Sequence, residues 1–108
     1  MYVTLRKYTP QGPLSREVVD ELTHRIQDEF LPLLQEIPGF HGYYAVRCGE
    51  HDFMTINLFE TETGAAESTR RAAEFRRTHP LPVELGEPDV VEGEVIASRE
   101  APREVGAH

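Results

Sequence analysis

The fold of this chain is decided by the stretch DFMTINLFE at residues 52–60. It is typical of a β-strand, in which successive side chains point to opposite faces, so Met54, Ile56 and Leu58 share one face. The two phenylalanines share the other face with a threonine and an asparagine. Both faces of this strand are therefore largely apolar, and both need a covering layer.

The number of helices limits how such a strand can be covered. An antiparallel sheet in a small domain normally packs one face on the core and leaves the other hydrated. Only two long amphipathic patterns exist elsewhere in the chain, enough to cover one face. We therefore expect a second copy of the sheet to cover the other face, which makes the functional unit a homodimer.

The N-terminal half is predicted to form a strand and a long helix. Residues 2–8 alternate as a strand and stop at a turn rich in proline and glycine. Ser15 is a good N-cap, and apolar residues then recur at spacings of three and four up to residues 37–39. Pro32 lies inside this pattern and has no N–H, so a kink or a restart is expected near Leu31.

The next elements are predicted to be a hairpin and a second helix. A strand at residues 40–47 leads through a tight turn at residues 48–51 into the decisive strand. Thr61 or Thr63 is expected to cap an alanine-rich helix that runs to about Thr78. Its inner side is expected to carry Ala65, Ala66, Ala72 and Ala73, with Phe75 as the anchor on the sheet.

The C-terminal part completes a single domain. A loop at residues 79–88 precedes a last strand at residues 89–97. The domain is expected to span residues 1–98, and residues 99–108 are expected to form a disordered tail. The order β-α-β-β-α-β predicts an α+β, ferredoxin-like sandwich with a four-stranded antiparallel sheet and both helices on one face.

Composition excludes several classes of partner. The chain has 108 residues and a net charge of -8, so a phosphate-backbone partner, and hence a nucleic acid, is not expected. Cys48 is the only cysteine, which excludes an intramolecular disulfide and a cysteine-based zinc cluster. No apolar run approaches the roughly 18 residues of a membrane span, and no signal peptide is recognisable, so we expect a cytoplasmic protein without a membrane partner.

Three motifs resemble a known family. They are LLxxIPGF over residues 33–40, GYY at residues 42–44, and LFET at residues 58–61 before the alanine-rich helix. They are similar to the antibiotic-biosynthesis-monooxygenase-like (ABM) domains of the dimeric α+β barrel superfamily, and the resemblance covers residues 2–98. It implies that two sheets pair into a barrel with the helices outside, in agreement with the argument from residues 52–60.

The same resemblance implies activities but not the residues for them. The family includes cofactor-independent monooxygenases of phenolic or quinol-like aromatics and a separate haem-degrading branch. In the oxygenase branch a tryptophan matches Phe59, an asparagine matches Thr55, and a tyrosine falls near Ala65, so all three usual catalytic residues are absent here. The haem branch uses the same tryptophan and a histidine on the second helix; this chain has no tryptophan, and its predicted second helix has no histidine before His79. No cofactor is therefore expected.

A looser polar constellation remains around Asn57. It shares a strand face with Thr55 and Phe59, and Tyr44 stands beside them if the hairpin loop has an even number of residues. A slip of one residue brings Tyr43 and His41 there instead. An asparagine amide and a tyrosine hydroxyl can hold and polarise an aromatic hydroxyl or carbonyl. The commoner alternative is a buried asparagine that only satisfies neighbouring backbone groups.

The assigned roles follow from this constellation. Asn57, Tyr44 and His41 are the candidate catalytic residues, because a histidine can act as a general base near neutral pH. Thr55, Phe59 and Tyr43 are the candidate substrate contacts. No histidine pair has the spacing of a metal site, so none is predicted.

Two hypotheses for function follow. The first is an oxygenase-like enzyme that holds a small aromatic substrate against Phe59. The second is a non-catalytic ligand-binding or stress-associated dimer, which the absent catalytic residues favour slightly. An open, hydrated space around Asn57 would support an enzyme or a sensor, whereas tight packing would support a structural role.

Overall fold

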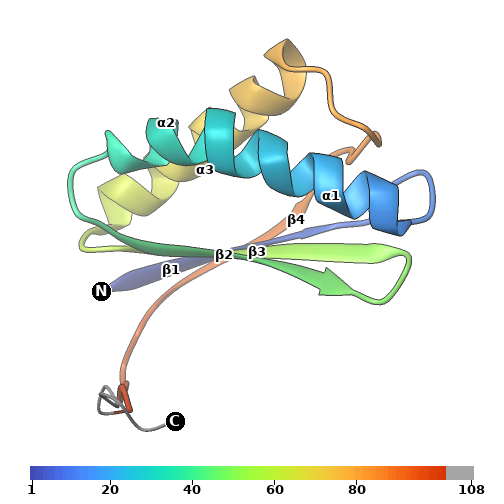
Figure 1. Ribbon diagram of the computed structural model, residues 1–108. Helices are drawn as coiled ribbons and strands as arrows, with labels where there is room; N and C mark the ends of the chain where they lie inside the picture. The colour runs from blue at the N-terminus through green and yellow to red at the C-terminus, as the bar shows by residue number, and fades with distance from the viewer. Residues whose placement is uncertain (102–108) are drawn as a thin grey trace, which may run out of the picture.

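The computed structural model describes residues 1–101 and has the predicted α+β architecture, with helices packed on one face of an antiparallel sheet (Figure 1). The elements in chain order are β1 (Tyr2–Tyr8), α1 (Arg16–Arg25), η1 (Ile26–Phe30), α2 (Leu31–Gln35), β2 (Phe40–Cys48), β3 (Asp52–Phe59), α3 (Glu62–Thr78) and β4 (Asp89–Glu94). The strands lie in the order β2-β3-β1-β4, and every neighbouring pair is antiparallel. The predicted ferredoxin-like fold is confirmed.

The first helix is interrupted where a restart was expected. The hydroxyl of Ser15 accepts a hydrogen bond from the backbone N–H of Val18 at 3.3 Å and caps α1. After Arg25 the helix widens into the π-helical turn η1, and α2 begins at Leu31 with Pro32 in its first turn. A proline lacks the N–H of a regular helical bond and its ring clashes with the preceding turn, so a wider turn relieves the conflict.

The second long helix begins and packs largely as predicted. Thr61 is its N-cap, with its hydroxyl accepting from the Gly64 N–H at 3.2 Å. Phe75 is buried, and its ring lies 5.1 Å from the ring of Phe30. Two of the four alanines expected on the inner side, Ala65 and Ala72, are buried, whereas Ala66 and Ala73 are exposed.

The turn between β2 and β3 sets which side chains of β2 face the helices. Cys48 pairs with Asp52, so the loop has three residues, 49–51, and Gly49 adopts a φ of 78° within it. This odd number selects the slipped alternative of the two registers considered above. Tyr43 consequently pairs with Asn57 on the inner face of the sheet.

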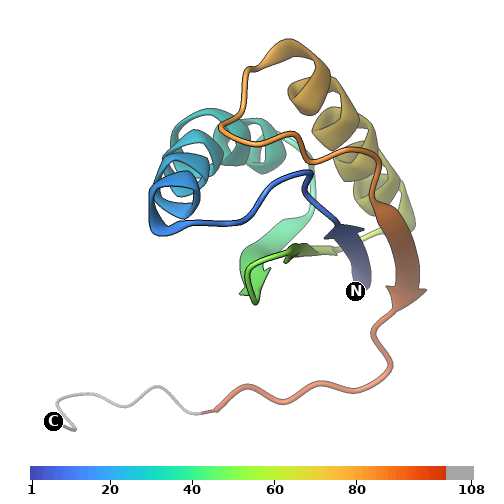
Figure 2. The ribbon, with the colours of Figure 1, turned by 90° about the vertical axis from the view of Figure 1, so that its right-hand side faces the viewer.

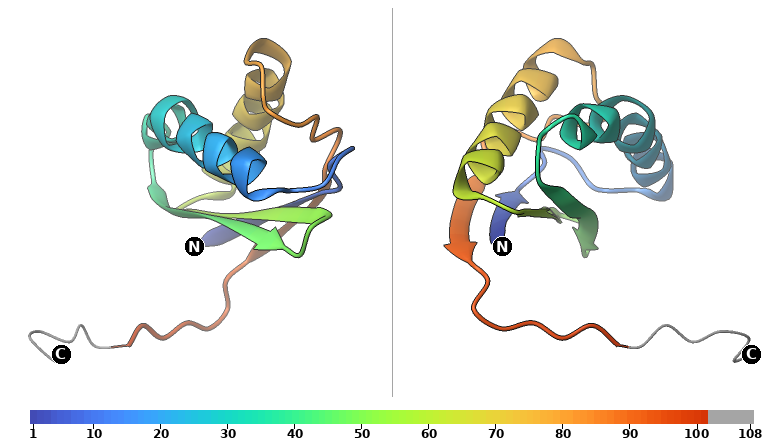
Figure 3. Two further views of the ribbon diagram at one scale, coloured as in Figure 1. Left: turned by 45° about the vertical axis from the view of Figure 1, so that its right-hand side comes forward. Right: turned by 90° about the vertical axis from the view of Figure 1, so that its left-hand side faces the viewer.

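The last strand is shorter than predicted. It ends at Glu94 rather than residue 97, because Glu94 pairs with Tyr2 at the start of β1 and the partner strand ends there. One more backbone bond follows, from the Val95 N–H to the Met1 carbonyl at 2.8 Å. Figures 2 and 3 show the following residues running away from the sheet. The predicted tail at 99–108 has no regular structure up to residue 101, and its remainder lies outside the described residues.

The two faces of the sheet have different surroundings. The inner face packs on the helices and forms the core, with Phe53, Thr55, Asn57 and Phe59 of β3 all buried. We call the opposite side the outer face; Lys7 and Asp89 lie at one end of it. Its other large side chains are those of Val3, Leu5, Tyr44, Val46, Met54, Ile56, Leu58 and Val91. No element among residues 1–101 covers it (Figures 1 and 3). The homodimer that would cover it stays a prediction.

No helix within the described part of the chain combines the length and the apolar character needed to cross a membrane.

Candidate functional site

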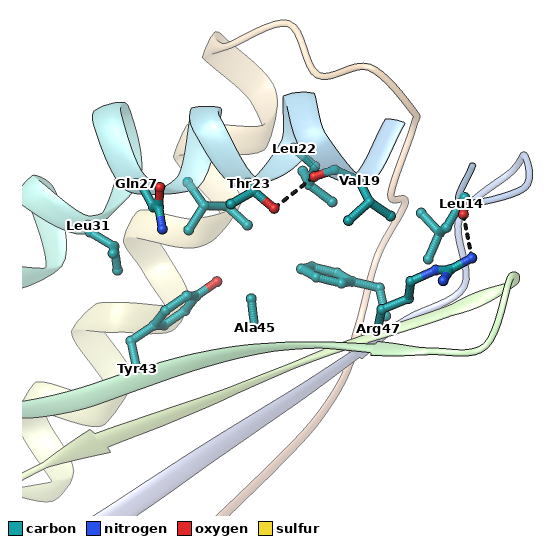
Figure 4. Close-up of a pocket in the computed structure, with 11 residues that line it drawn as sticks. Leu14, Val19, Leu22, Thr23, Gln27, Leu31, Tyr43, Ala45 and Arg47 are labelled. Atoms are coloured by element: carbon teal, nitrogen blue, oxygen red, sulfur yellow. Dashed lines mark hydrogen bonds between the residues drawn. The ribbon is translucent and has the colours of Figure 1, made fainter. Parts of the chain in front are cut away.

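A cavity of about 260 Å³ lies between α1 and the inner face of β2 (Figure 4). Its walls are mainly apolar, with Leu22 and Ile26 from the helical side and Phe53 from the sheet. Its size is near the lower end of the roughly 300–1,000 Å³ of small-molecule sites. The cavity therefore suits a small ligand.

The inner face of β2 forms the floor of this cavity. Tyr43, Ala45 and Arg47 lie in alternate positions of the strand and line it, with Ala45 between the two larger side chains (Figure 4). Because Ala45 ends at a methyl group, the space above it stays unfilled. Ala45 is also exposed, so the cavity is open to solvent.

Polar groups are few and two of them are already engaged. The hydroxyl of Thr23 donates to the Val19 carbonyl at 2.7 Å, and Arg47 Nη2 donates to the Leu14 carbonyl at 2.8 Å. The hydroxyl of Tyr43 has no hydrogen-bond partner among the residues that line the cavity (Figure 4). The Gln27 amide also lines the cavity without a partner there, so Tyr43 and Gln27 are the polar groups placed to bind a ligand.

The environment of Tyr43 fixes both its orientation and its protonation. Its ring packs edge-on against Phe30, with 5.8 Å between ring centroids. Burial raises the pKa of Tyr43, and the nearby charge of Arg6 offsets this only in part. The hydroxyl therefore stays protonated and serves as a hydrogen-bond donor, not as a general base.

Behind Tyr43, a buried arginine lies between the sheet and α3. Arg6 is 1% exposed, and its Nη1 donates to the hydroxyls of Ser68 at 3.3 Å and Thr69 at 3.2 Å. Its Nη2 donates to Asn57 Oδ1 at 2.8 Å. All three acceptors are neutral, and Arg6 Nε has no partner among residues 1–101.

A second, smaller cavity of about 30 Å³ borders Arg6. We call it the inner cavity. It shares the walls formed by Leu22, Ile26, Tyr43 and Phe53 with the larger cavity, so the two spaces are neighbours across these side chains. Polar and apolar regions of the site are thereby adjacent.

Asn57 holds Arg6 and the sheet together. It is fully buried, and its Nδ2 donates to the Thr4 carbonyl at 3.1 Å and to the Thr55 hydroxyl at 3.3 Å, while its Oδ1 accepts from Arg6. Both amide hydrogens are thus used within the protein. Asn57 is not among the residues that line the larger cavity. This is the geometry of the commoner alternative, a buried asparagine paired with its neighbours.

The predicted substrate contacts are separated by the structure. Tyr43 lines both cavities, and Thr55 lines the inner one. Phe59 is fully buried, packs on Phe40 with 5.6 Å between ring centroids, and lines neither cavity. Of these three residues, only Tyr43 reaches the larger space.

Two of the predicted catalytic residues lie away from the cavity. Tyr44 pairs with Ile56 on the outer face and is 60% exposed, so its placement beside Asn57 is corrected by the three-residue turn. His41 sits at a bulge in β2, is exposed, and hydrogen-bonds the carboxylate of Glu60, whose pKa it lowers. Within residues 1–101, no group of three or more histidine, cysteine, aspartate or glutamate side chains could hold a metal ion.

Arg6 was missed in the sequence because β1 is inverted relative to the usual pattern. Its apolar residues Val3 and Leu5 face outward, while Thr4, Arg6 and Tyr8 face the helices and are buried. A strand normally turns its apolar side to the core. One signal in the sequence was available. Because β3 is apolar on both faces, its pattern does not decide which face of the neighbouring strand β1 points to the helices, so Arg6 could have been considered for the inner face.

Comparisons with known proteins identify the fold. No protein-family model matches the chain. No curated protein matches it either. A monooxygenase from the ActVA-Orf6 gene of Streptomyces coelicolor, solved with nanaomycin D, has a TM-score of 0.68 at 18% identity, covering 94% of this chain and 92% of that one.

Two further solved structures agree. The haem degrader MhuD from Mycobacterium tuberculosis has a TM-score of 0.64 at 17% identity, covering 93% of this chain and 100% of that one. A candidate antibiotic biosynthesis monooxygenase from Bacillus cereus has a TM-score of 0.58 at 17% identity, covering 95% and 98%. Identities this low establish the fold alone. The chain has the fold of antibiotic-biosynthesis-monooxygenase domain proteins, on which both oxygenation and haem degradation are found.

Proposed function

We propose that this protein is a homodimer that binds a small, flat aromatic molecule with a hydroxyl or carbonyl group in the cavity between α1 and β2. The observation that carries the proposal is the cavity of about 260 Å³, with apolar walls and the free hydroxyl of Tyr43. An aromatic body would replace water along Leu22, Ile26 and Phe53. The tyrosine hydroxyl would donate to the oxygen of the ligand.

Binding is preferred over catalysis because of what lines the cavity. Within the described part of the chain, no carboxylate and no histidine contributes to its walls, so no side chain there is suited to remove a proton from the ligand. Tyr43 stays protonated and Asn57 is engaged elsewhere. A non-catalytic ligand-binding dimer therefore fits the geometry best.

Cofactor-independent oxygenation of the bound aromatic is the second candidate. Its support is the likeness in fold to the Streptomyces coelicolor monooxygenase solved with nanaomycin D. A readily ionised substrate would need no strong base from the protein. Dioxygen uptake with 1,5-dihydroxynaphthalene, compared with and without protein, separates the candidates: an uptake rate above that of the buffer alone would favour the enzyme.

The proposal is tested by filling the cavity. In Ala45→Phe the larger side chain would occupy the floor, and the affinity for 1-naphthol, measured by isothermal titration calorimetry, is expected to fall at least tenfold, about 1.4 kcal/mol. Ala66 is exposed on α3, so Ala66→Phe is a matched control and should bind like the wild type. Equal binding of 1-naphthol by both variants would contradict the assignment of this cavity.

A further inference from the structure

The distribution of charge in this protein is unusual. Nineteen acidic residues outnumber eleven lysines and arginines, yet the fully buried charged side chain among residues 1–101 is that of Arg6. None of the salt bridges formed by residues 1–101 includes Arg6. Burial lowers its pKa, but an arginine remains protonated in proteins. A permanent positive charge is thus held away from water without a counter-ion.

The hydrogen bonds of Arg6 do not remove this problem. Ser68, Thr69 and Asn57 are neutral acceptors that orient the guanidinium group but leave its charge uncompensated. Its Nε has no acceptor at all among the described residues. Buried charges in proteins are normally paired, because desolvation of a lone ion is very unfavourable. An arginine held this way is arranged to meet an anion that comes from outside.

The inner cavity beside Arg6 is equipped for such an anion. Arg76 also borders it and donates from Nη1 to the Tyr8 hydroxyl at 3.1 Å, so two guanidinium groups line one small space. No carboxylate of residues 1–101 lines it. Its volume of about 30 Å³ matches that of one water molecule in the liquid, about 30 Å³, which is room for one oxygen atom of a ligand.

The structure assigns to the inner cavity an anion subsite, in which Arg6 binds the carboxylate or phenolate oxygen of a ligand whose aromatic body fills the larger cavity. The inference rests on the proposed function for the body of the ligand, and it adds the class, an aromatic acid. The two spaces share Tyr43 and Phe53 as a common wall, so one molecule can reach both when these rings shift. A charge-assisted bond to Arg6 would then be stronger than one to a neutral group.

The test compares two ligands of nearly the same shape. 2-Naphthoate and 2-naphthamide differ in charge at about pH 7, where a carboxyl is ionised and an amide is neutral. Isothermal titration calorimetry on the intact protein is expected to give at least tenfold tighter binding of the naphthoate. The preference should fall to about one in Arg6→Gln and should survive in Arg6→Lys, which keeps a charge. Arg70 lies on the exposed side of α3, so Arg70→Gln is the control that should keep the full preference.

Each outcome has a clear meaning. Equal affinity for both ligands in the wild type would overturn the anion subsite while leaving aromatic binding in the larger cavity intact. A preference that persists in Arg6→Gln would overturn the assignment to Arg6. Binding of neither ligand would count against both this inference and the proposed function. If Arg6→Gln does not fold, the ¹⁵Nε resonance of Arg6 in the wild type serves instead: it should move with naphthoate and stay in place with naphthamide.

Discussion

Tyr43 carries a hydroxyl that none of its neighbours in the cavity wall engages. Because the ring is held by Phe30, removing the hydroxyl in Tyr43→Phe should leave the packing intact. One net hydrogen bond contributes about 0.5–1.5 kcal/mol, so the dissociation constant for 1-naphthol is expected to rise about 2- to 10-fold. Isothermal titration calorimetry measures this change.

Tyr44 provides the comparison for that experiment. It follows Tyr43 in the chain but lies on the outer face, so Tyr44→Phe should bind 1-naphthol like the wild type. An affinity lowered in Tyr44→Phe and unchanged in Tyr43→Phe would mean that the register of the hairpin is different in solution.

The candidate site could be predicted only in part, and the reason is local geometry. The alternation of β3 correctly places Asn57 and Thr55 on one buried face. Whether Tyr43 or Tyr44 lies beside them depends on whether the loop between β2 and β3 has an odd or an even number of residues. The sequence alone does not determine that number. Arg6 was missed because β1 turns its polar side to the helices, and because a buried cation without a partner departs from the rule that buried charges are paired.

At the scale of elements, the start of α3 offers a direct test, since Thr61 and Thr63 were both possible caps. Only the hydroxyl of Thr61 accepts from a backbone N–H at the helix start. Thr61→Ala is therefore expected to lower the free energy of unfolding by about 1 kcal/mol, measured by urea denaturation. Thr63→Ala is the control, with a change below about 0.5 kcal/mol. Equal losses in the two variants would argue against this cap.

The exposed side of α3 predicts a dependence of stability on pH. Hydrogen bonds from Arg70 and Arg71 lower the pKa of Glu67 to about 2, from an ordinary value of 4.5. A carboxyl with a lowered pKa in the folded state stabilises the protein above its ordinary pKa, and this contribution is lost as the pH falls towards the folded value. In Glu67→Gln, the melting temperature should therefore fall less steeply between pH 4.5 and 2 than in the wild type.

That comparison is made by thermal unfolding across the acidic range. Glu62→Gln, in the first turn of the same helix, is the reference variant, because Glu62 forms no ion pair among the described residues. Identical slopes for Glu67→Gln and the wild type would show that the ion pairs of α3 are too well hydrated to matter.

Most elements were predictable because their signals are local. Caps, apolar spacing and Pro32 correctly indicate both long helices and the break near Leu31. The end of β4 was not predictable, because it depends on where its partner β1 ends in space.

At the scale of the whole molecule, the outer face is a large, mostly apolar surface that no element among residues 1–101 covers. Its central residue Ile56 lies between Leu5 of β1 and Tyr44 of β2. Ile56→Lys would place a charge at the middle of a sheet-to-sheet interface, and buried unpaired charges are strongly unfavourable. Light scattering after size exclusion should give twice the 12.3 kDa chain mass for the wild type and a single chain mass for this variant.

The control for the dimer is a lysine of the same charge on the helix side. Ala66 is exposed there, so Ala66→Lys should remain a dimer. A wild-type protein that elutes as a monomer would contradict the homodimer and leave the apolar outer face without an explanation.

The π-helical turn η1 determines the direction in which the side chains on either side of it point. Leu22, Ile26, Phe30 and Leu34 are all buried and are spaced strictly by four residues. A straight α-helix advances about 100° per residue, so such a repeat would wind around the helix by about 40° at each step and carry Leu34 away from the sheet. The wider turn at η1 rotates less per residue, so it offsets this advance and keeps one line of side chains directed at the sheet. The helical side chains that line the ligand cavity and those that pack in the core therefore point in the same direction. Deleting one residue from η1 would rotate the residues that follow it relative to Leu22 and Ile26, and would disturb the cavity and the core at once.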